Sequence, residues 1–136
     1  MGSGREVIDR IVAAQNAGDL DALVACFADD YRSEQPLHPA RTFEGTEQVR
    51  RNWSAILAGV RGFRAATVRV AEDGDTVFAE VRWTGTRADG TALDQRGVLI
   101  AGVRDGQLAW GRLYVDDVAS DEEHVEAVAR RMAGDA

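Results

Sequence analysis

Three Asp-Gly pairs recur at one constant interval through the second half of the chain, each flanked by alternating apolar residues: Asp73-Gly74, Asp89-Gly90 and Asp105-Gly106. A two-residue hairpin turn of type I′ needs positive φ at both central residues, which Asp tolerates and Gly adopts freely. The pairs therefore predict a four-stranded antiparallel meander over residues 63–117. Its arms are longer than a usual strand and contain glycines, so we expect the sheet to bend into a cup.

The register of this meander follows if each Asp-Gly pair supplies the two central residues of its turn. Four cross-strand pairs result: Val70 with Val77, Trp83 with Arg96, Asp94 with Asp117, and Arg96 with Val115. A bulge at Gly97 or Gly111 would exchange the two faces of the sheet beyond it, so that Asp116 and Asp117 trade places.

The same register sorts the side chains of the sheet into two faces. One face is apolar and is expected to meet the helices: Ala66, Val68, Val70, Val77, Ala79, Val81, Trp83, Val98, Ile100, Leu113 and Val115. A charged group lies at one end of that face: Arg64, Asp94, Arg96 and Asp117. The other face mixes charged and apolar side chains in the manner of a subunit interface, among them Phe63, Phe78, Leu99, Trp110, Tyr114 and Asp116.

Apolar residues at helical spacing precede the meander. A first helix stops at Gly18, which suits a left-handed cap, and a second starts at Asp19 and runs to about residue 29 with Phe27 in its apolar stripe. A short strand over residues 31–35 is stopped by Pro36.

A proline-stiffened loop over residues 36–41 then leads to a third helix, which opens at Thr46 and has Trp53 on its apolar face. After the meander, a charged helix over about residues 121–133 is expected to dock weakly. These elements predict an α+β fold in which the N-terminal helices pack in the concave face of a strongly curved antiparallel sheet.

Composition bounds the function. A chain of 136 residues with 45% hydrophobic content suits a single domain over residues 1–136, with its core over about 5–118. The net charge of −7 and a pI near 4.8 argue against a nucleic-acid partner. The chain has no apolar stretch that could span a membrane and no leader at Met1, so we expect no membrane partner and a cytoplasmic location.

Other residue types exclude some chemistry. The lone cysteine, Cys26, lies beside a helical apolar stripe and is expected to be a buried thiol. The two histidines have no spacing typical of a metal site, and no glycine-rich phosphate loop opens a helix. We therefore expect neither a metal nor a cofactor.

The order of these elements resembles that of the nuclear transport factor 2-like (NTF2-like) superfamily, a cone-shaped α+β barrel, and most of all its SnoaL-like group. The resemblance covers nearly the whole chain. The local motifs that carry it are Asp19-Leu20-Asp21-Ala22-Leu23, Phe27-Ala28-Asp29-Asp30, Phe43-Glu44-Gly45, residues 49–53, Val103-Arg104-Asp105-Gly106-Gln107 and Tyr114-Val115-Asp116. These motifs are typical of the fold rather than of one chemistry, since the superfamily includes isomerases, cyclases, hydrolases, dehydratases and proteins without known catalysis.

The resemblance also shows where this chain departs from particular enzymes. Ketosteroid isomerases of this fold place their base Asp just before a proline, where this chain has Gln35, and an amide cannot abstract a proton. Limonene-epoxide-hydrolase-like members have an inward Asp on the last strand, where this chain has Leu113. SnoaL-type polyketide cyclases have an Asp at the end of that strand, which here is Asp116 or Asp117.

Two groups of residues are candidates for a site. Asp94, Arg96 and either Asp116 or Asp117 are the catalytic candidates, because a carboxylate held by an arginine is a plausible general base; a salt bridge that closes the rim of the sheet is the alternative. The binding candidates are Tyr31, Glu34, His38, Arg41, Trp53, Arg64 and Trp83. A ligand is expected between the concave face and residues 36–41.

Two hypotheses about function follow. The first is an acid–base enzyme of the SnoaL-like type that works without a cofactor as an isomerase, cyclase or dehydratase on a small hydrophobic carbonyl compound. The second is a non-catalytic module that binds a small ligand or a protein. A homodimer is expected through Phe78, Leu99, Trp110 and Tyr114, since so many apolar groups on an outer face form an adhesive surface.

Overall fold

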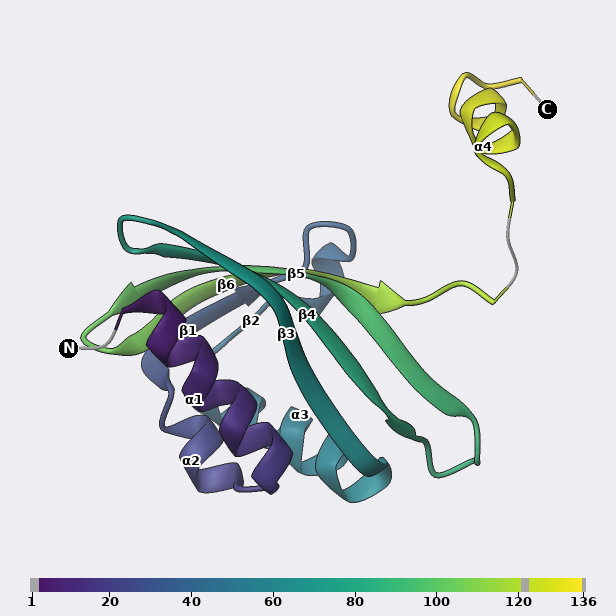
Figure 1. Ribbon diagram of the computed structural model, residues 1–136. Coiled ribbons are helices and arrows are strands. Elements are labelled where there is room, and N and C mark those ends of the chain that lie inside the picture. Colours follow the sequence, from purple (N-terminus) through teal and green to yellow (C-terminus); the bar gives the residue numbers. More distant parts are fainter. Residues whose placement is uncertain (1–2, 121–122, 136) are drawn as a thin grey trace.

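The computed structural model describes residues 3–120 and 123–135. A six-stranded curved sheet that does not close into a barrel has helices on its concave face, so the fold is α+β and NTF2-like, as predicted (Figure 1). The strand order is β2-β1-β6-β5-β4-β3. None of the helices in the described ranges is long and apolar enough to cross a membrane.

The helices follow local signals in the sequence. Helix α1 (Gly4–Ala17) is capped by the hydroxyl of Ser3 and ends at Gly18, whose φ of 66° is left-handed as predicted. Asp19 caps α2, but α2 (Leu20–Val24) is shorter than expected, and Phe27 begins strand β1 (Phe27–Glu34) instead of extending the helix. The prediction for Phe27 was wrong because its apolar side chain fits both a helical stripe and a strand that faces the same core.

The rest of the first half follows the predicted order. A 3-10 turn (Pro39–Arg41) and strand β2 (Phe43–Glu44) lead into α3 (Thr46–Gly59). At the other end of the chain, α4 (Val125–Met132) lies apart from the sheet and from the other helices in Figure 1. The expected start of this last helix, at residues 121–122, lies outside the described residues.

The predicted meander is present as four long strands in sequence order: β3 (Arg61–Asp73), β4 (Thr76–Thr86), β5 (Ala92–Arg104) and β6 (Gln107–Asp117). Strand β1 then pairs in parallel with β6, and β2 pairs antiparallel with β1. The helices α1 and α3 and the concave face bury a common core, which includes Val7, Ile8, Val49, Val77 and Leu108.

The predicted register was wrong, because only the third Asp-Gly pair forms the expected turn. There Asp105 has φ 54° and Gly106 φ 73°, and Arg104 pairs with Gln107. In the first hairpin Asp73 pairs with Thr76, so the turn is made by residues 74–75. Val70 therefore pairs with Ala79 instead of Val77.

The loop of the second hairpin is one residue longer than predicted, and this turns strand β5 over. The backbone N–H of Arg87 donates to the carbonyl of Thr91 at 2.8 Å, which leaves three loop residues, 88–90. This odd number shifts the pairing by one residue and turns every side chain of β5 to the other face. Trp83 consequently pairs with Gln95, and Arg96 lies on the opposite face from Trp83, contrary to the prediction.

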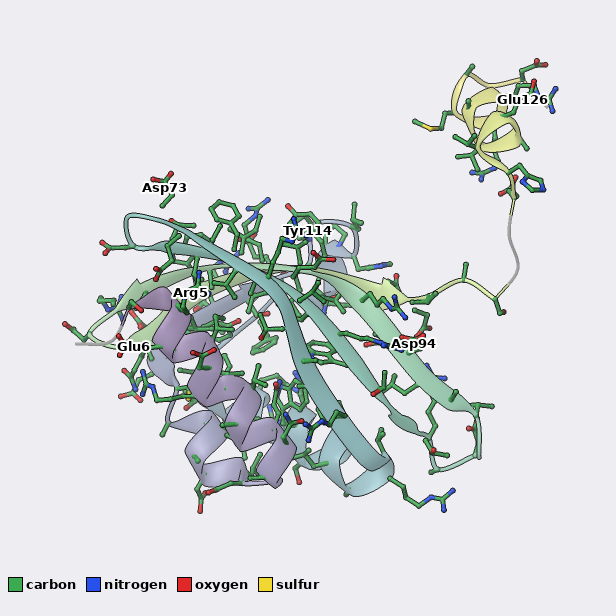
Figure 2. The ribbon with its side chains drawn as sticks, viewed as in Figure 1. Arg5, Glu6, Asp73, Asp94, Tyr114 and Glu126 are labelled. Atoms are coloured by element: carbon green, nitrogen blue, oxygen red, sulfur yellow. The ribbon has the colours of Figure 1, made fainter. Side chains whose placement is uncertain are left out.

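A bulge at Ala109 corrects the shift again in β6, because Val103 pairs with Leu108 whereas Gly102 pairs with Trp110. Leu113 and Val115 are therefore concave as predicted, and Figure 2 shows Tyr114 on the convex side of the sheet, away from α1. The predicted faces are wrong for β5 and for the part of β3 that precedes its bulge. Phe63 and Leu99 are concave, whereas Arg64, Ala66, Asp94, Arg96, Val98 and Ile100 are convex, and Val68 is exposed at the bulge itself.

Candidate functional site

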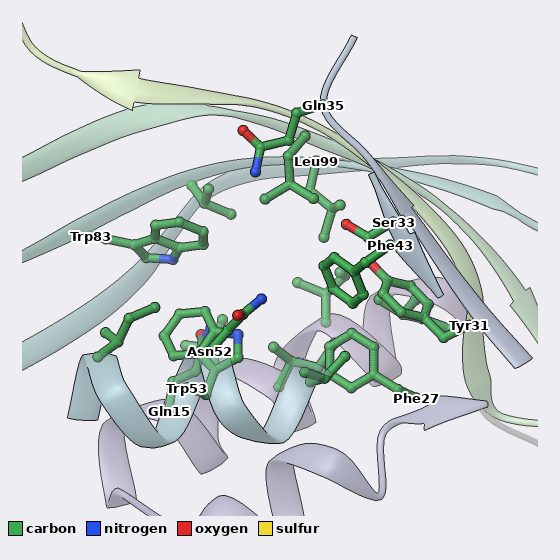
Figure 3. Close-up of a pocket in the computed structure, with 18 residues that line it drawn as sticks. Gln15, Phe27, Tyr31, Ser33, Gln35, Phe43, Asn52, Trp53, Trp83 and Leu99 are labelled. Atoms are coloured by element: carbon green, nitrogen blue, oxygen red, sulfur yellow. The ribbon is translucent and has the colours of Figure 1, made fainter. Parts of the chain in front are cut away.

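An apolar cavity of about 190 Å³ lies between the helices and the concave face (Figure 3). Five aromatic side chains contribute to its wall: Phe27, Tyr31, Phe43, Trp53 and Trp83. Aliphatic side chains complete it, including Ile8, Val49, Leu99 and Leu113. Concave, mostly apolar surfaces with a few polar groups are the usual form of a small-molecule site.

Three elements, α1, α3 and β1, supply most of the residues that line this cavity. Helix α1 contributes Ile8, Ile11, Val12 and Gln15 at helical spacing, and α3 contributes Val49, Asn52, Trp53 and Ile56 at the same spacing. From β1, alternate residues point inward, so Tyr31 and Ser33 reach the cavity, followed by Gln35 beyond the strand end.

The polar groups of the cavity are neutral. They are the amides of Gln15, Gln35 and Asn52 and the hydroxyls of Tyr31 and Ser33. Among the described residues that line the cavity there is no Asp, Glu, His, Lys or Arg. Since an uncompensated charge is costly to transfer into such an apolar space, the lining favours an uncharged ligand.

Tyr31 is the titratable group of the cavity wall. It is 3% exposed and packs edge-on against Phe27, with ring centroids 4.8 Å apart. Burial raises the pKa of its phenol to about 12, and the neighbouring Ser33 hydroxyl has a smaller, opposite effect. The phenol is therefore protonated at neutral pH and can donate a hydrogen bond into the cavity.

A cluster of aromatic rings in edge-to-face contact forms one side of the cavity. Trp53 contacts Trp83 edge-on, with ring centroids 5.4 Å apart, and contacts Phe63 on its other side at 5.5 Å. These contacts hold Trp83 in a fixed position on the cavity wall. Trp83 and Trp53 thus form a rigid apolar wall.

Three of the predicted binding residues, Tyr31, Trp53 and Trp83, line this one cavity. The predicted catalytic group does not come together there. Asp94 lies on the convex face between Arg82 and Arg96, with closest charged atoms 3.6 and 3.4 Å apart respectively. The expected approach to Trp83 was wrong because of the three-residue loop described above.

Asp117 lies at the end of β6 and borders a hollow at the rim of the sheet together with Asp94 and Arg87. Its carboxylate accepts hydrogen bonds from Arg87 at 3.0 Å and from Gln95 at 3.2 Å. It pairs across the sheet with Gln95 instead of Asp94, which corrects the predicted pair. Asp117 and Arg87 thus form an exposed ion pair at the rim of the sheet.

Asp116 contacts His38, with Oδ2 and Nε2 3.3 Å apart. The backbone N–H of Asp117, and then His38, lower the pKa of the Asp116 carboxyl, which makes it a weaker base. In Figure 1 the loop over residues 36–41 lies on the convex side of the sheet. His38 and Asp116 border a second hollow, and none of residues 36–41 lines the main cavity, so the prediction that this loop covers the main cavity was wrong.

The remaining binding candidates also point elsewhere. Glu34 alternates outward from Tyr31 and Ser33 and lies 3.8 Å from Arg112. Arg64 is exposed on the convex side, opposite Thr84. Arg41 is exposed and donates a hydrogen bond to Gln35, so it contacts a residue of the cavity wall without lining the cavity itself.

The sequence-based reasoning missed four polar residues of the cavity as site residues: Gln15, Ser33, Gln35 and Asn52. Two of them, Gln15 and Asn52, have a signal in the sequence: a polar residue placed within a helical stripe that is otherwise apolar. Gln15 continues the helical series of Ile8 and Ile11, and Asn52 occupies the same kind of position in α3. Such an interruption costs stability unless the polar group is used, and it therefore indicates a site.

Other reactive groups lie outside the cavity. Cys26 is buried as expected, its Sγ donates to the carbonyl of Ala22 at 3.4 Å, and burial raises the pKa of its thiol, so it is not an activated nucleophile. Within residues 3–120 and 123–135, no cluster of three or more His, Cys, Asp or Glu side chains could hold a metal ion.

A curved sheet that encloses a ligand-sized apolar cavity together with its helices defines an NTF2-like protein. The chain belongs to the SnoaL-like domain family, whose sequence model matches residues 8–110. Fold and family therefore agree with the resemblance found in the sequence.

Solved structures share this fold. A protein of ketosteroid isomerase-like fold from Catenulispora acidiphila, in complex with trimethylamine, is 18% identical, with a TM-score of 0.70 over 82% of this chain and 85% of that one. An NTF2-like protein of unknown function from Exiguobacterium is 21% identical, with a TM-score of 0.69 over 82% and 99%. A Mycobacterium tuberculosis protein in complex with estradiol-17β-hemisuccinate is 17% identical, with a TM-score of 0.70 over 81% and 91%.

Proposed function

We propose that this protein binds a small, uncharged and largely apolar molecule in the cavity between α1, α3 and the concave face. The observation that carries this proposal is the lining itself, in which aromatic and aliphatic walls surround a few neutral hydrogen-bonding groups. The complexes of the Catenulispora protein with trimethylamine and of the Mycobacterium protein with estradiol-17β-hemisuccinate support the small-molecule part of this proposal, since this fold accommodates small organic ligands in both.

Isothermal titration calorimetry, which measures the affinity for a panel of cyclohexanone, tetralone and naphthol, tests the proposal. Leu99 lines the cavity, and its sequence neighbour Ile100 lies on the convex face of the same strand. Leu99→Trp fills the cavity and should weaken binding at least about tenfold, since a ring then occupies the ligand volume. The matched variant Ile100→Trp should bind as the wild type does.

Two outcomes would contradict this function. One is that no member of the panel binds the folded wild-type protein at millimolar concentration. The other is that Ile100→Trp loses as much affinity as Leu99→Trp, which would place the ligand on the convex face or make the loss an effect on the strand as a whole.

Acid–base catalysis on a small carbonyl compound, as an isomerase, cyclase or dehydratase, is the second candidate. One observation favours it: the protonated Tyr31 hydroxyl lines the cavity, where it could stabilise negative charge on a carbonyl oxygen. The identity of the residue that acts as general base remains a prediction. Asp94 and Asp117 lie at the rim of the sheet and not in the cavity, so either can act as that base only on a substrate that extends to the rim. In that case Asp94→Asn or Asp117→Asn should lower turnover about a hundredfold while the fold is kept.

A further inference from the structure

The amides of the cavity wall are held in one orientation by arginines that lie outside it. Arg41 Nη1 donates to Gln35 Oε1 at 3.0 Å. A guanidinium group has only donors, so the atom of Gln35 that faces it must be the oxygen. The Nε2 group of Gln35 is therefore turned away from Arg41, and Figure 3 shows it directed into the cavity.

A second chain of hydrogen bonds fixes Asn52 in the same way. Arg51 Nη2 donates to Gln48 Oε1 at 2.8 Å, which leaves Gln48 Nε2 to donate to Asn52 Oδ1 at 2.7 Å. The oxygen of Asn52 is thus occupied by a protein donor. Its Nδ2 group points into the cavity from the side opposite Gln35 (Figure 3).

The cavity consequently presents N–H donors at two separate places. Gln15, which is 4% exposed, adds an amide that makes no hydrogen bond to another described side chain and is free to meet a ligand. A ligand with N–H groups at the two fixed positions would bring donor against donor and leave both without a partner. Such unpaired buried groups discriminate strongly between ligands.

We propose that the cavity selects a neutral ring compound with carbonyl-type acceptor oxygens at two separate positions, one facing Gln35 and the other facing Asn52. In this proposal Arg41 and Arg51 are positioning residues that set the preference without touching the ligand. It rests on the proposed ligand-binding function and names the chemical class of that ligand.

Titration with three matched probes tests this class: decalindione, the decalone with one carbonyl, and decalin with none. Each carbonyl should improve affinity about five- to tenfold in the wild-type protein, as expected for one hydrogen bond. Gln35→Leu and Asn52→Leu should each remove the advantage of one carbonyl. If all three probes bind equally well, the proposal is overturned while the binding function stands; if none binds, both fall.

A double-mutant cycle tests the role of the arginines. Arg41→Met keeps the apolar stem but frees Gln35 to rotate, so the preference for the dione over the decalone should fall about fivefold. The same substitution should have no further effect in the Gln35→Leu background, and Arg41→Lys, which keeps a donor, should retain the preference. An equal effect of Arg41→Met in both backgrounds would show that Arg41 acts on the fold in general and would overturn its assignment. Arg51→Met in the Asn52→Leu background gives the corresponding test for the second chain.

Discussion

Tyr31 shows how burial sets the chemistry of a single residue in this cavity. The pKa of its phenol is about 12 in the folded chain, against an ordinary value of 10.0. The folded state therefore holds this proton more tightly than the unfolded state. The contribution of this proton to the free energy of unfolding is fully present below about pH 10 and is lost as the pH rises to about 12.

A spectrophotometric titration of tyrosinate should accordingly contain a step near pH 12, and that step should be missing in Tyr31→Phe. The phenylalanine variant should also lose less stability than the wild type between about pH 10 and 12, because it has no phenol to ionise in the core. A wild-type curve in which Tyr31 titrates at its ordinary value would mean that water reaches the hydroxyl and that the cavity wall is open.

Individual site residues could be predicted where one pattern decides their position. Tyr31, Trp53 and Trp83 were found because helical spacing in α3 and alternation in β1 and β4 set their faces, which do not depend on the length of the second hairpin loop. Asp94 and Arg96 were misplaced because their face depends on the length of one loop. Gln15 and Asn52 were missed because a polar residue within an apolar stripe was not weighed as a signal.

At the level of elements, the meander was predictable because Asp-Gly is a strong signal for a hairpin. The length of each loop was not, because Asp-Gly fits a two-residue turn and also the end of a longer loop. In the second hairpin Gly90 has φ 87° at the end of a three-residue loop, whereas in the third Asp105 and Gly106 both have positive φ. One residue of loop length decides the face of a whole strand.

In strand β6, Gly111 leaves the space that the side chains of Tyr31 and Leu99 occupy in the cavity wall. A Cβ atom on Gly111 would lie 2.5 Å from the Tyr31 hydroxyl and 3.4 Å from Leu99 Cδ1. Gly111→Ala should therefore displace Tyr31 and lower the free energy of unfolding by about 1–3 kcal/mol. Gly59→Ala is the matched control, since nothing lies within 4 Å of its added Cβ, and it should be neutral or slightly stabilising.

Chemical denaturation of the two variants measures this difference. If Gly111→Ala is as stable as the control, Tyr31 does not pack against this glycine, and the described packing of the cavity wall is wrong.

At the level of the whole molecule, the convex face combines charges with partly exposed aromatic side chains. Phe78 is 38% exposed, and Trp110 and Tyr114 are half-buried on the same face. Leu99 does not belong to this surface, because it lines the cavity. Dimerisation through the convex face therefore stays a prediction that now rests on Phe78, Trp110 and Tyr114.

Sedimentation equilibrium at micromolar concentrations should find a dimer of the wild-type chain. Phe78→Arg should shift it toward monomer, because a charge at the centre of an apolar contact has no partner there. Val68→Arg serves as the control, since Val68 is also exposed but lies at the bulge of the edge strand β3. A wild-type protein that stays monomeric throughout would rule out this interface.

A crystal structure after soaking with cyclic ketones and phenols shows directly whether the cavity binds a small ring compound. We predict electron density for one ring between Trp83 and Tyr31, in contact with the aliphatic wall and with no carboxylate in the cavity. A cavity that is filled by its own side chains under all soaks, or a ligand bound instead at the hollow between His38 and Asp116, would show that this cavity is not the binding site.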